Sequence, residues 1–200
     1  MTHYIYLVRH GEHQDAEHGL ADGPLSTRGR RQASLLADRL SGVPLDAVWH
    51  SPLERAAETA RAVAERLPSV APEPSALLFD CVPTGMTAQT PSAFESFFGA
   101  VTEAQIDAGA AQMEDAVAAF LMRKPGEVHE LLITHNFVIG WFVREVLQAP
   151  PWRWMTLNQA HCGLTVIAQK QGRPWTLLSH NDLAHLPFEL RTGLVELPPV

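Results

Sequence analysis

Cysteine is scarce in this sequence, and the two that occur, Cys81 and Cys162, lie far apart and form no C-x-x-C arrangement. Disulfide-stabilised secreted proteins and zinc ribbons need more cysteines at closer spacing. We therefore exclude both classes and expect two free thiols in a reducing compartment.

Positive charge is also in deficit, with 15 Lys and Arg against 22 Asp and Glu and a formal net charge of -7. Nucleic acids and anionic membrane surfaces attract proteins that present an excess of positive charge. We expect neither as a partner, and any anion that this protein binds must be held by a local cluster of cations.

Long apolar runs are missing as well: none approaches the roughly 20 residues that span a bilayer. The first ten residues, MTHYIYLVRH, lack the basic segment and apolar stretch of a secretory signal. These absences predict a cytoplasmic location. A length of 200 residues, 46% of them hydrophobic, suffices for one sizeable core, so we predict a single domain over residues 1–200.

What the sequence does contain is an alternation of short apolar runs and amphipathic stretches. The patterns predict strands over residues 4–8, 47–50, 130–134, 164–168 and 175–179, and helices over 28–40, 51–67, 110–122 and 137–147. The proline-containing stretch 68–91 predicts loops, with one short apolar run at 76–79. This order is typical of an α/β three-layer sandwich, a central, mostly parallel sheet with helices on both faces.

Two helix starts carry capping signals. Ser26 or Thr27 precedes the first helix, and Ser51 with Glu54 forms a capping-box pattern at the second. That start places Arg55 in the first helical turn, where the helix dipole disfavours a cation unless an anion is also present. We therefore interpret Arg55 as a phosphate ligand.

Two predicted strands end in chargeable side chains. Arg9 and His10 follow the first apolar run, and Gly11 would let the backbone turn so that both side chains face one pocket. His135 follows a later strand in the same way, and Asn136 could cap the helix behind it. Ligands of open α/β sheets bind at the carboxyl ends of strands. The constellation predicts a phosphate site with a neutral imidazole that could attack phosphorus in line.

Four segments, LVRHGE, PLSTRGRRQA, SPLERAAETA and ITHNFVI, resemble in their order and spacing the serial motifs of the histidine phosphatase superfamily, which has the phosphoglycerate-mutase-like fold. The segments LLFDCVPTG, QAPPWRWMTLNQAHCGLTVI and HNDLAHLP are similar to mitochondrial phosphoglycerate-mutase-like protein phosphatases and their bacterial relatives. The resemblance implies a metal-independent phosphomonoesterase that needs no cofactor and works through a phosphohistidine.

The resemblance also implies roles, motif by motif. His10 matches the nucleophile, and Arg9, Arg55 and His135 match the residues that bind the phosphate and stabilise the transferring phosphoryl group. His10 and His135 would thus both contact the phosphate.

The general acid of the family is a carboxylate on the loop after the third apolar run, a place that Asp80 occupies here. Family members commonly carry the longer glutamate there, so Glu95 stays open as the alternative. Glu12 resembles a group beside the substrate, and Gly11 and Asn136 are expected to support the site.

A metal hydrolase is the first rival interpretation. In HELLITH, however, His129 and His135 are six positions apart, whereas zinc-binding H-E-x-x-H places its histidines four apart. His10, His13 and His18 are candidate metal ligands, but a loop without ordered spacing is weak evidence for a metal site. We therefore predict no metal.

Other phosphate chemistries fit less well. A cysteine-dependent phosphatase needs an arginine six positions after the thiol, where Thr87 and Ala168 stand, and no P-loop motif occurs. A phosphoglycerate-mutase-type phosphotransferase and a non-catalytic binder of phosphorylated ligands remain as alternatives. The substrate could be a phosphorylated small molecule or a phosphoprotein. The apolar tail 186–200 also makes a homo-oligomer conceivable.

Overall fold

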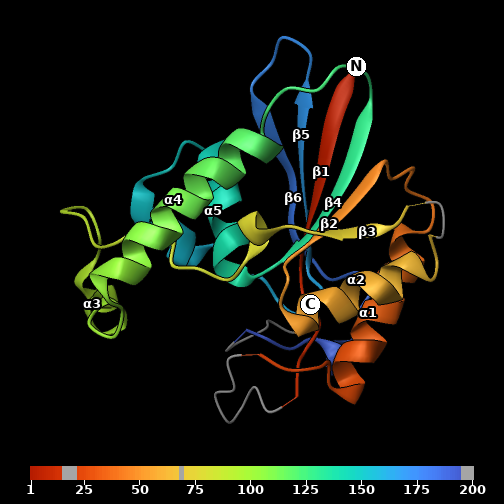
Figure 1. The fold of residues 1–200 in the computed structure, drawn as a ribbon, viewed down its shortest axis with the longest axis horizontal. Coiled ribbons are helices and arrows are strands. Elements are labelled where there is room, and N and C mark those ends of the chain that lie inside the picture. Colours follow the sequence, from red (N-terminus) through yellow and green to blue (C-terminus); the bar gives the residue numbers. More distant parts are fainter. Residues whose placement is uncertain (15–21, 68–69, 195–200) are drawn as a thin grey trace.

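A computed structural model describes residues 1–14, 22–67 and 70–194. It contains a six-stranded sheet with the order β3-β2-β4-β1-β5-β6 (Figure 1). The strands are β1 (Thr2–Arg9), β2 (Ala47–His50), β3 (Pro72–Pro74), β4 (Val128–Thr134), β5 (Leu164–Lys170) and β6 (Trp175–Asp182). All five predicted strands are present, and the three-residue edge strand β3 was not predicted because its sequence, PEP, carries no apolar pattern.

The sheet is mostly parallel, as predicted. β4 pairs in parallel with β1 and β2, and β2 with β3, whereas β5 runs antiparallel to both β1 and β6. The amino end of β5 therefore lies at the same edge of the sheet as the carboxyl ends of β1 and β4.

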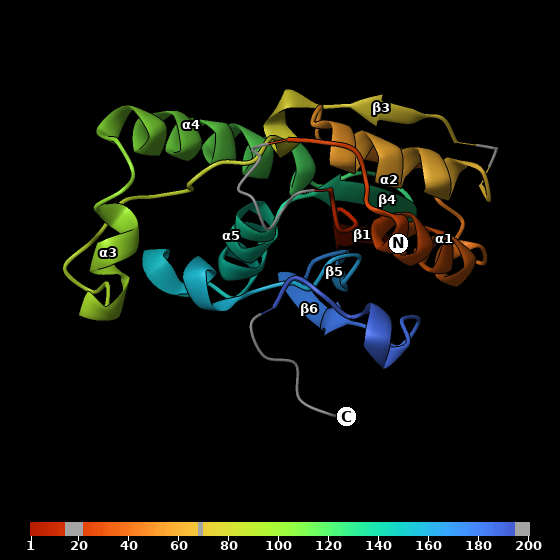
Figure 2. The ribbon, with the colours of Figure 1, turned by 90° about the horizontal axis from the view of Figure 1, so that it is seen from below.

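Helices cover both faces of this sheet. The helices are α1 (Thr27–Leu40), α2 (Glu54–Ala64), α3 (Glu95–Phe98), α4 (Glu103–Phe120) and α5 (Asn136–Val146), with short 3₁₀ turns η2 (Ala76–Leu78), η3 (Ser92–Phe94), η4 (Pro151–Thr156) and η5 (Phe188–Leu190). The α1 and α2 pair lies apart from α4 and α5 in both views (Figures 1 and 2). The predicted three-layer sandwich is confirmed.

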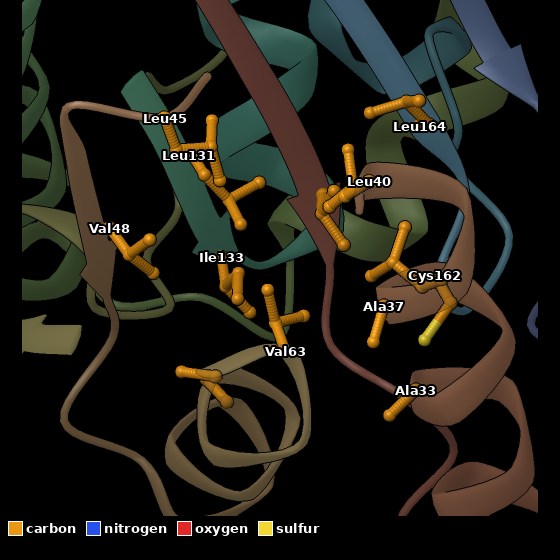
Figure 3. Close-up of a cluster of buried hydrophobic side chains, with 14 of the residues drawn as sticks. Ala33, Ala37, Leu40, Leu45, Val48, Val63, Leu131, Ile133, Cys162 and Leu164 are labelled. Carbon is orange, nitrogen blue, oxygen red and sulfur yellow. The ribbon is translucent and has the colours of Figure 1, made fainter. Parts of the chain in front are cut away.

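Each face of the sheet buries its own apolar cluster, because successive strand residues point to opposite sides. On β1, Val8 belongs to one cluster with Ala33 and Ala37 of α1 and Val63 of α2. Figure 3 shows these helix residues pointing into the cluster. Its neighbour Leu7 packs on the opposite face with α4 and α5. The two clusters hold β1 and β4 rigidly at the centre of the molecule.

Two predicted helix starts are wrong in detail. α2 begins at Glu54 with Leu53 as its N-cap and no side-chain cap, so the capping box of Ser51 and Glu54 does not form. α4 begins at Glu103, well before residue 110, because Thr102 and Gln105 form a capping box on a turn whose side chains are mostly exposed and show no apolar period. The Ser26 cap of α1 is confirmed.

None of the helices within the described ranges is long and apolar enough to cross a membrane. In the C-terminal tail, Leu186 is buried and Phe188 is exposed, and residues 195–200 lie outside the described part. The homo-oligomer stays a prediction.

Candidate active site

His10 lies directly after β1 and is 3% exposed. Its Nδ1 is 2.8 Å from the carbonyl oxygen of Gly11, which can only accept, so Nδ1 carries the proton. The other nitrogen, Nε2, therefore keeps its lone pair and accepts a hydrogen bond from Arg55 Nε at 3.1 Å. Burial first, and then the nearby His135 and Arg9, hold the pKa of His10 well below its usual range. His10 is therefore a neutral imidazole whose unprotonated nitrogen is Nε2.

Arg55 occupies the first turn of α2, as the sequence predicts, and is 4% exposed. Besides His10, its guanidinium donates to Asp80 Oδ2 at 3.2 Å and to Asp22 Oδ1 at 3.1 Å. Nη2, the nitrogen that donates to Asp80, also lies 3.3 Å from His135 Nδ1. One guanidinium thus joins elements that are far apart in the sequence.

His135 lies beyond β4, and its ring centroid is 5.1 Å from that of His10. Since Arg55 donates to Nδ1, the proton of His135 is on Nε2, which donates to Ser51 Oγ at 2.8 Å. This contact explains why Ser51 does not cap α2: its hydroxyl serves His135 instead.

Asp80 is the carboxylate that the structure brings to these histidines. Its Oδ2 lies 3.7 Å from His135 Nδ1 in addition to its ion pair with Arg55. Burial raises the pKa of Asp80, and the Arg55 and Arg9 guanidiniums partly oppose that rise. Glu95 is exposed on α3, which Figures 1 and 2 place at the far end of α4. The geometry favours Asp80 over Glu95 as the acid.

Arg9 ends β1 and ties three chain segments together. Its Nη1 donates to the carbonyl oxygens of Gln159 at 2.8 Å and Gly193 at 2.9 Å, and its Nε is buried with no hydrogen-bond partner among the described residues. Burial lowers the pKa of Arg9 to about 10, so it stays charged at neutral pH. Arg9 therefore adds positive charge to the pocket and holds the surrounding loops.

Gly11 is required for a different reason from the one predicted. Its φ is not positive, so no special turn aims Arg9 and His10. Instead, a Cβ at Gly11 would lie 2.8 Å from the backbone oxygen of Gly29 in α1, too close for any side chain. Glycine permits this loop to pack on the helix.

Asn136 and Glu12 support neighbouring loops. Asn136 is the first residue of α5 and not its cap; its Oδ1 accepts from the Gln159 backbone at 2.6 Å. Glu12 accepts from Ser26 Oγ at 2.8 Å and pairs with Arg28 at the start of α1. Both residues position groups around the site, and neither contacts His10 in the bonds recorded for the described residues.

Sequence reasoning missed Thr59 and His161. Thr59 Oγ1 accepts from the Gly11 backbone at 3.0 Å and donates to the Arg55 carbonyl at 2.7 Å. Its position four residues after Arg55, on the same helix face, was an available signal. His161 lies 5.5 Å from His10 between ring centroids. It precedes β5, and only the antiparallel direction of that strand brings it to the site.

A groove of about 580 Å³ opens beside Arg55 and Asp80. Its walls are mainly apolar, and Arg55 is the single cation among the described residues that line it: Asp22, Leu53, Arg55, Phe79, Asp80, Cys81, Val82, Gln105, Ala108, Gly109, Gln112 and Phe137. The groove could hold the organic part of a phosphorylated compound whose phosphate lies against His10.

The two cysteines are unpaired, as expected. Burial raises the pKa of Cys81 to about 12 and that of Cys162 further still, so neither is a thiolate at neutral pH. The raised pKa values disfavour a thiolate nucleophile at both positions.

Comparisons with known proteins agree with this geometry. The model of the histidine phosphatase superfamily (branch 1) matches residues 5–183. The solved structure of Bacillus stearothermophilus YhfR is similar, with a TM-score of 0.73 and 25% sequence identity over 92% of this chain and 98% of that one.

Curated relatives carry two kinds of name. The chain is 28% identical to the serine/threonine-protein phosphatase Pgam5, mitochondrial, of Caenorhabditis briggsae, over 91% of this chain and 64% of the relative. It is 25% identical to the probable phosphoglycerate mutase GpmB of Serratia proteamaculans, over 91% of this chain and 94% of the relative. The chain thus spans slightly less than two thirds of the length of that Pgam5 relative.

Proposed function

Because the chain belongs to the histidine phosphatase superfamily, we propose that it is a phosphomonoesterase that hydrolyses its substrate through a phosphohistidine on His10. The observation that carries this proposal is the fixed tautomer of His10, whose Nε2 lone pair faces Arg55 in a buried pocket. Its lowered pKa keeps that nitrogen unprotonated at neutral pH.

In the first step, His10 Nε2 attacks the phosphorus, and the bond between phosphorus and the ester oxygen breaks. Arg55 and Arg9 supply guanidinium charge to the phosphoryl oxygens, which gather negative charge in the transition state. The negative phosphate also favours the imidazolium form of His135, which then offers a further N–H. Asp80 gives its proton to the leaving oxygen, and the alcohol departs.

In the second step, the Asp80 carboxylate takes a proton from a water molecule as that water attacks the phosphohistidine. The bond between nitrogen and phosphorus breaks, inorganic phosphate forms, and His10 regains its lone pair. The proton that Asp80 lost in the first step is thereby restored, and no metal or cofactor enters either step.

The groove supports a phosphatase with an apolar leaving group over a phosphoglycerate mutase. Phosphoglycerate carries a carboxylate that needs a second cation, and the described residues lining the groove offer Arg55 alone, which the phosphate would occupy. Phe79, Val82 and Phe137 instead present apolar surface to the substrate. An aromatic or aliphatic phosphomonoester fits this chemistry, whether a free metabolite or a side chain of a phosphoprotein.

The test is turnover of an aryl phosphate with and without a chelator, together with mass spectrometry of rapidly quenched protein. We expect activity that survives the chelator, phosphate trapped on His10, and a loss on the order of a thousandfold or more in His10→Gln. His129→Gln is the control, since His129 stacks on Tyr4 at the opposite end of the sheet. Activity lost with the chelator, or retained in His10→Gln, would overturn the proposal.

A further inference from the structure

Three histidines from separate segments converge beside the proposed phosphate site. His10 follows β1, His13 lies on the loop after it, and His161 precedes β5; one ring nitrogen of each lies within 4.8 Å of the others. The ring centroids of His10 are 5.8 Å from His13 and 5.5 Å from His161. The His10, His13 and His161 group is called the histidine trio below.

His161 turns one nitrogen into this group. The residue is 6% exposed, and its Nδ1 lies 3.0 Å from Thr192 Oγ1. Its Nε2 is buried and has no hydrogen-bond partner within the part of the chain that the structure describes. A buried polar nitrogen left unpaired is costly, so this atom indicates a missing ligand.

His10 also has a nitrogen with a lone pair, but this nitrogen, Nε2, already accepts from Arg55 Nε at 3.1 Å, a hydrogen bond that a bound cation would replace. Its Nδ1–H donates to the Gly11 carbonyl, and its Nε2 keeps a lone pair. A histidine that binds a metal through one nitrogen almost always donates the other N–H to an oxygen, which fixes the ring and its tautomer. Gly11 O does this for His10, and Thr192 Oγ1 can do it for His161.

His13 is held in place by the backbone on either side. It forms a β-bridge with Leu25, and the hydrogen bonds from Gln14 N to Pro24 O and from Ser26 N to Glu12 O flank that bridge. The loop is therefore fixed at the position where His13 approaches His10.

The charges around the trio do not prevent cation binding. Arg9 and Arg55 are positive, but Arg55 is paired with both Asp80 and Asp22. These carboxyl groups offset part of the positive charge. Three imidazoles form a ligand set that suits zinc, nickel and copper better than magnesium or calcium.

We propose that the histidine trio binds one divalent cation of the zinc class, with a fourth position open to water or a phosphate oxygen. The cation coordinates the Nε2 lone pair of His10, which is then unable to form a bond to phosphorus. The site is thus inhibitory. The inhibition rests on the proposed function, whereas the binding of the metal does not.

The test begins with Zn²⁺ alone, titrated into the full chain in competition with a chromophoric chelator. We expect one Zn²⁺ per chain, with affinity weakened about tenfold or more in His161→Asn and in His13→Asn, and unchanged in the control His129→Asn. X-ray absorption of the wild-type zinc complex, which needs no variant, should report three nitrogen ligands. For each variant, the rate with Zn²⁺ is divided by the rate of the same variant without Zn²⁺. His161→Asn should need a higher Zn²⁺ concentration than the wild type for the same fractional inhibition.

Outcomes separate the two proposals. Equal Zn²⁺ affinity in His161→Asn and wild type, or a zinc complex without three nitrogen ligands, overturns the metal site. Zinc binding as expected in a protein that never turns over a phosphate ester overturns the phosphatase instead. Zinc that binds at the trio without slowing turnover overturns the inhibitory role.

Discussion

Arg55 is the residue through which the other charged groups of the site are arranged. It touches His10, His135 and Asp80 at once, a task that needs several donors in a rigid plane. Lysine offers the same charge from a single point on a flexible stem. Charge alone therefore does not define this position.

Arg55→Lys should lower kcat for an aryl phosphate by at least about a hundredfold, because one ammonium cannot hold the phosphoryl oxygens and orient both histidines. The matched control is Arg61→Lys, an exposed arginine on the same helix, which should change kcat little. Steady-state rates at saturating substrate make the comparison. Near wild-type turnover in Arg55→Lys would show that only the charge matters.

Asp80 titrates beside the guanidiniums of Arg55 on α2 and Arg9 on β1 and near two imidazoles, those of His13 on the following loop and His135 beyond β4. Burial still raises its pKa above the ordinary value. A carboxyl with a raised pKa stays protonated to higher pH, which suits a general acid.

Asp80→Asn should slow hydrolysis of alkyl phosphates by about 10²–10⁴-fold and that of aryl phosphates much less, since a phenolate leaves with little protonation. In the wild type, the alkyl rate should fall as pH rises through the raised pKa of Asp80, and this limb should vanish in the variant. Rates across a pH series with both substrate types test this. Equal losses on both substrates would remove Asp80 as the acid.

At the scale of elements, α4 sets the position of the loop that carries Asp80. Gly109 faces the backbone of Val82 so closely that a Cβ there would collide with the Val82 carbonyl. Because the obstacle is backbone and not a flexible side chain, the loop itself would have to move. Gly109 therefore links helix packing to the position of Asp80, the proposed acid, two residues before Val82.

Gly109→Ala should displace this loop and lower alkyl phosphate hydrolysis more than aryl phosphate hydrolysis, at a stability cost of roughly 1–3 kcal/mol. Gly42→Ala serves as control, since a Cβ there meets no atom within 4 Å. Denaturant unfolding and the ratio of the two rates are the measurements. A Gly109→Ala protein with an unchanged ratio would show that the loop tolerates the shift.

Local patterns predicted the elements well and their ends less well. Strands such as β2 and the helix carrying Arg55 follow from apolar periods, which depend only on neighbouring residues. Ser51 shows the limit: its sequence context fits a capping box, yet a histidine 84 positions away takes its hydroxyl. A tertiary contact outweighed a local preference.

At the scale of the molecule, β4 carries a polar group at each end. His135 follows its carboxyl end, and near its amino end Glu130 is buried and accepts from His3, Trp49 and Lys124. Burial alone would raise the pKa of Glu130, but these three donors outweigh it and lower the pKa to about 2. The ionised carboxylate therefore contributes to stability.

Glu130→Gln should destabilise the fold by roughly 2 kcal/mol at neutral pH, because an amide cannot accept from all three donors. The pKa of Glu130 is lower in the folded state than in the unfolded state. Its contribution to the free energy of unfolding is therefore complete above the unfolded value of 4.5 and is lost as pH falls towards about 2. The wild type should lose stability in this window, and the variant should lose less. The free energy of unfolding is measured at several pH values, with the exposed Glu127→Gln as control. Parallel pH curves for the wild type and Glu130→Gln would contradict the prediction.

The site as a whole was only partly predictable. The sequence predicted that His10, His135 and Arg55 lie together, because two of them follow strands and one lies in the first turn of a helix. The carboxyl ends of parallel strands meet at one edge of a sheet. His161 was missed because its approach depends on the reversed direction of β5, which no local pattern encodes. The order of strands in the sheet is a property of the folded molecule.

The contacts of Arg9 also determine when, during synthesis of the chain, the site can be completed. The carbonyl oxygens that accept from this side chain belong to Gln159 and Gly193, which follow Arg9 by 150 and 184 residues. Such distant pairings are slow to form, since the intervening chain must first be closed into a loop. The pocket around the end of β1 is therefore complete only after both later segments have been synthesised and have packed against Arg9.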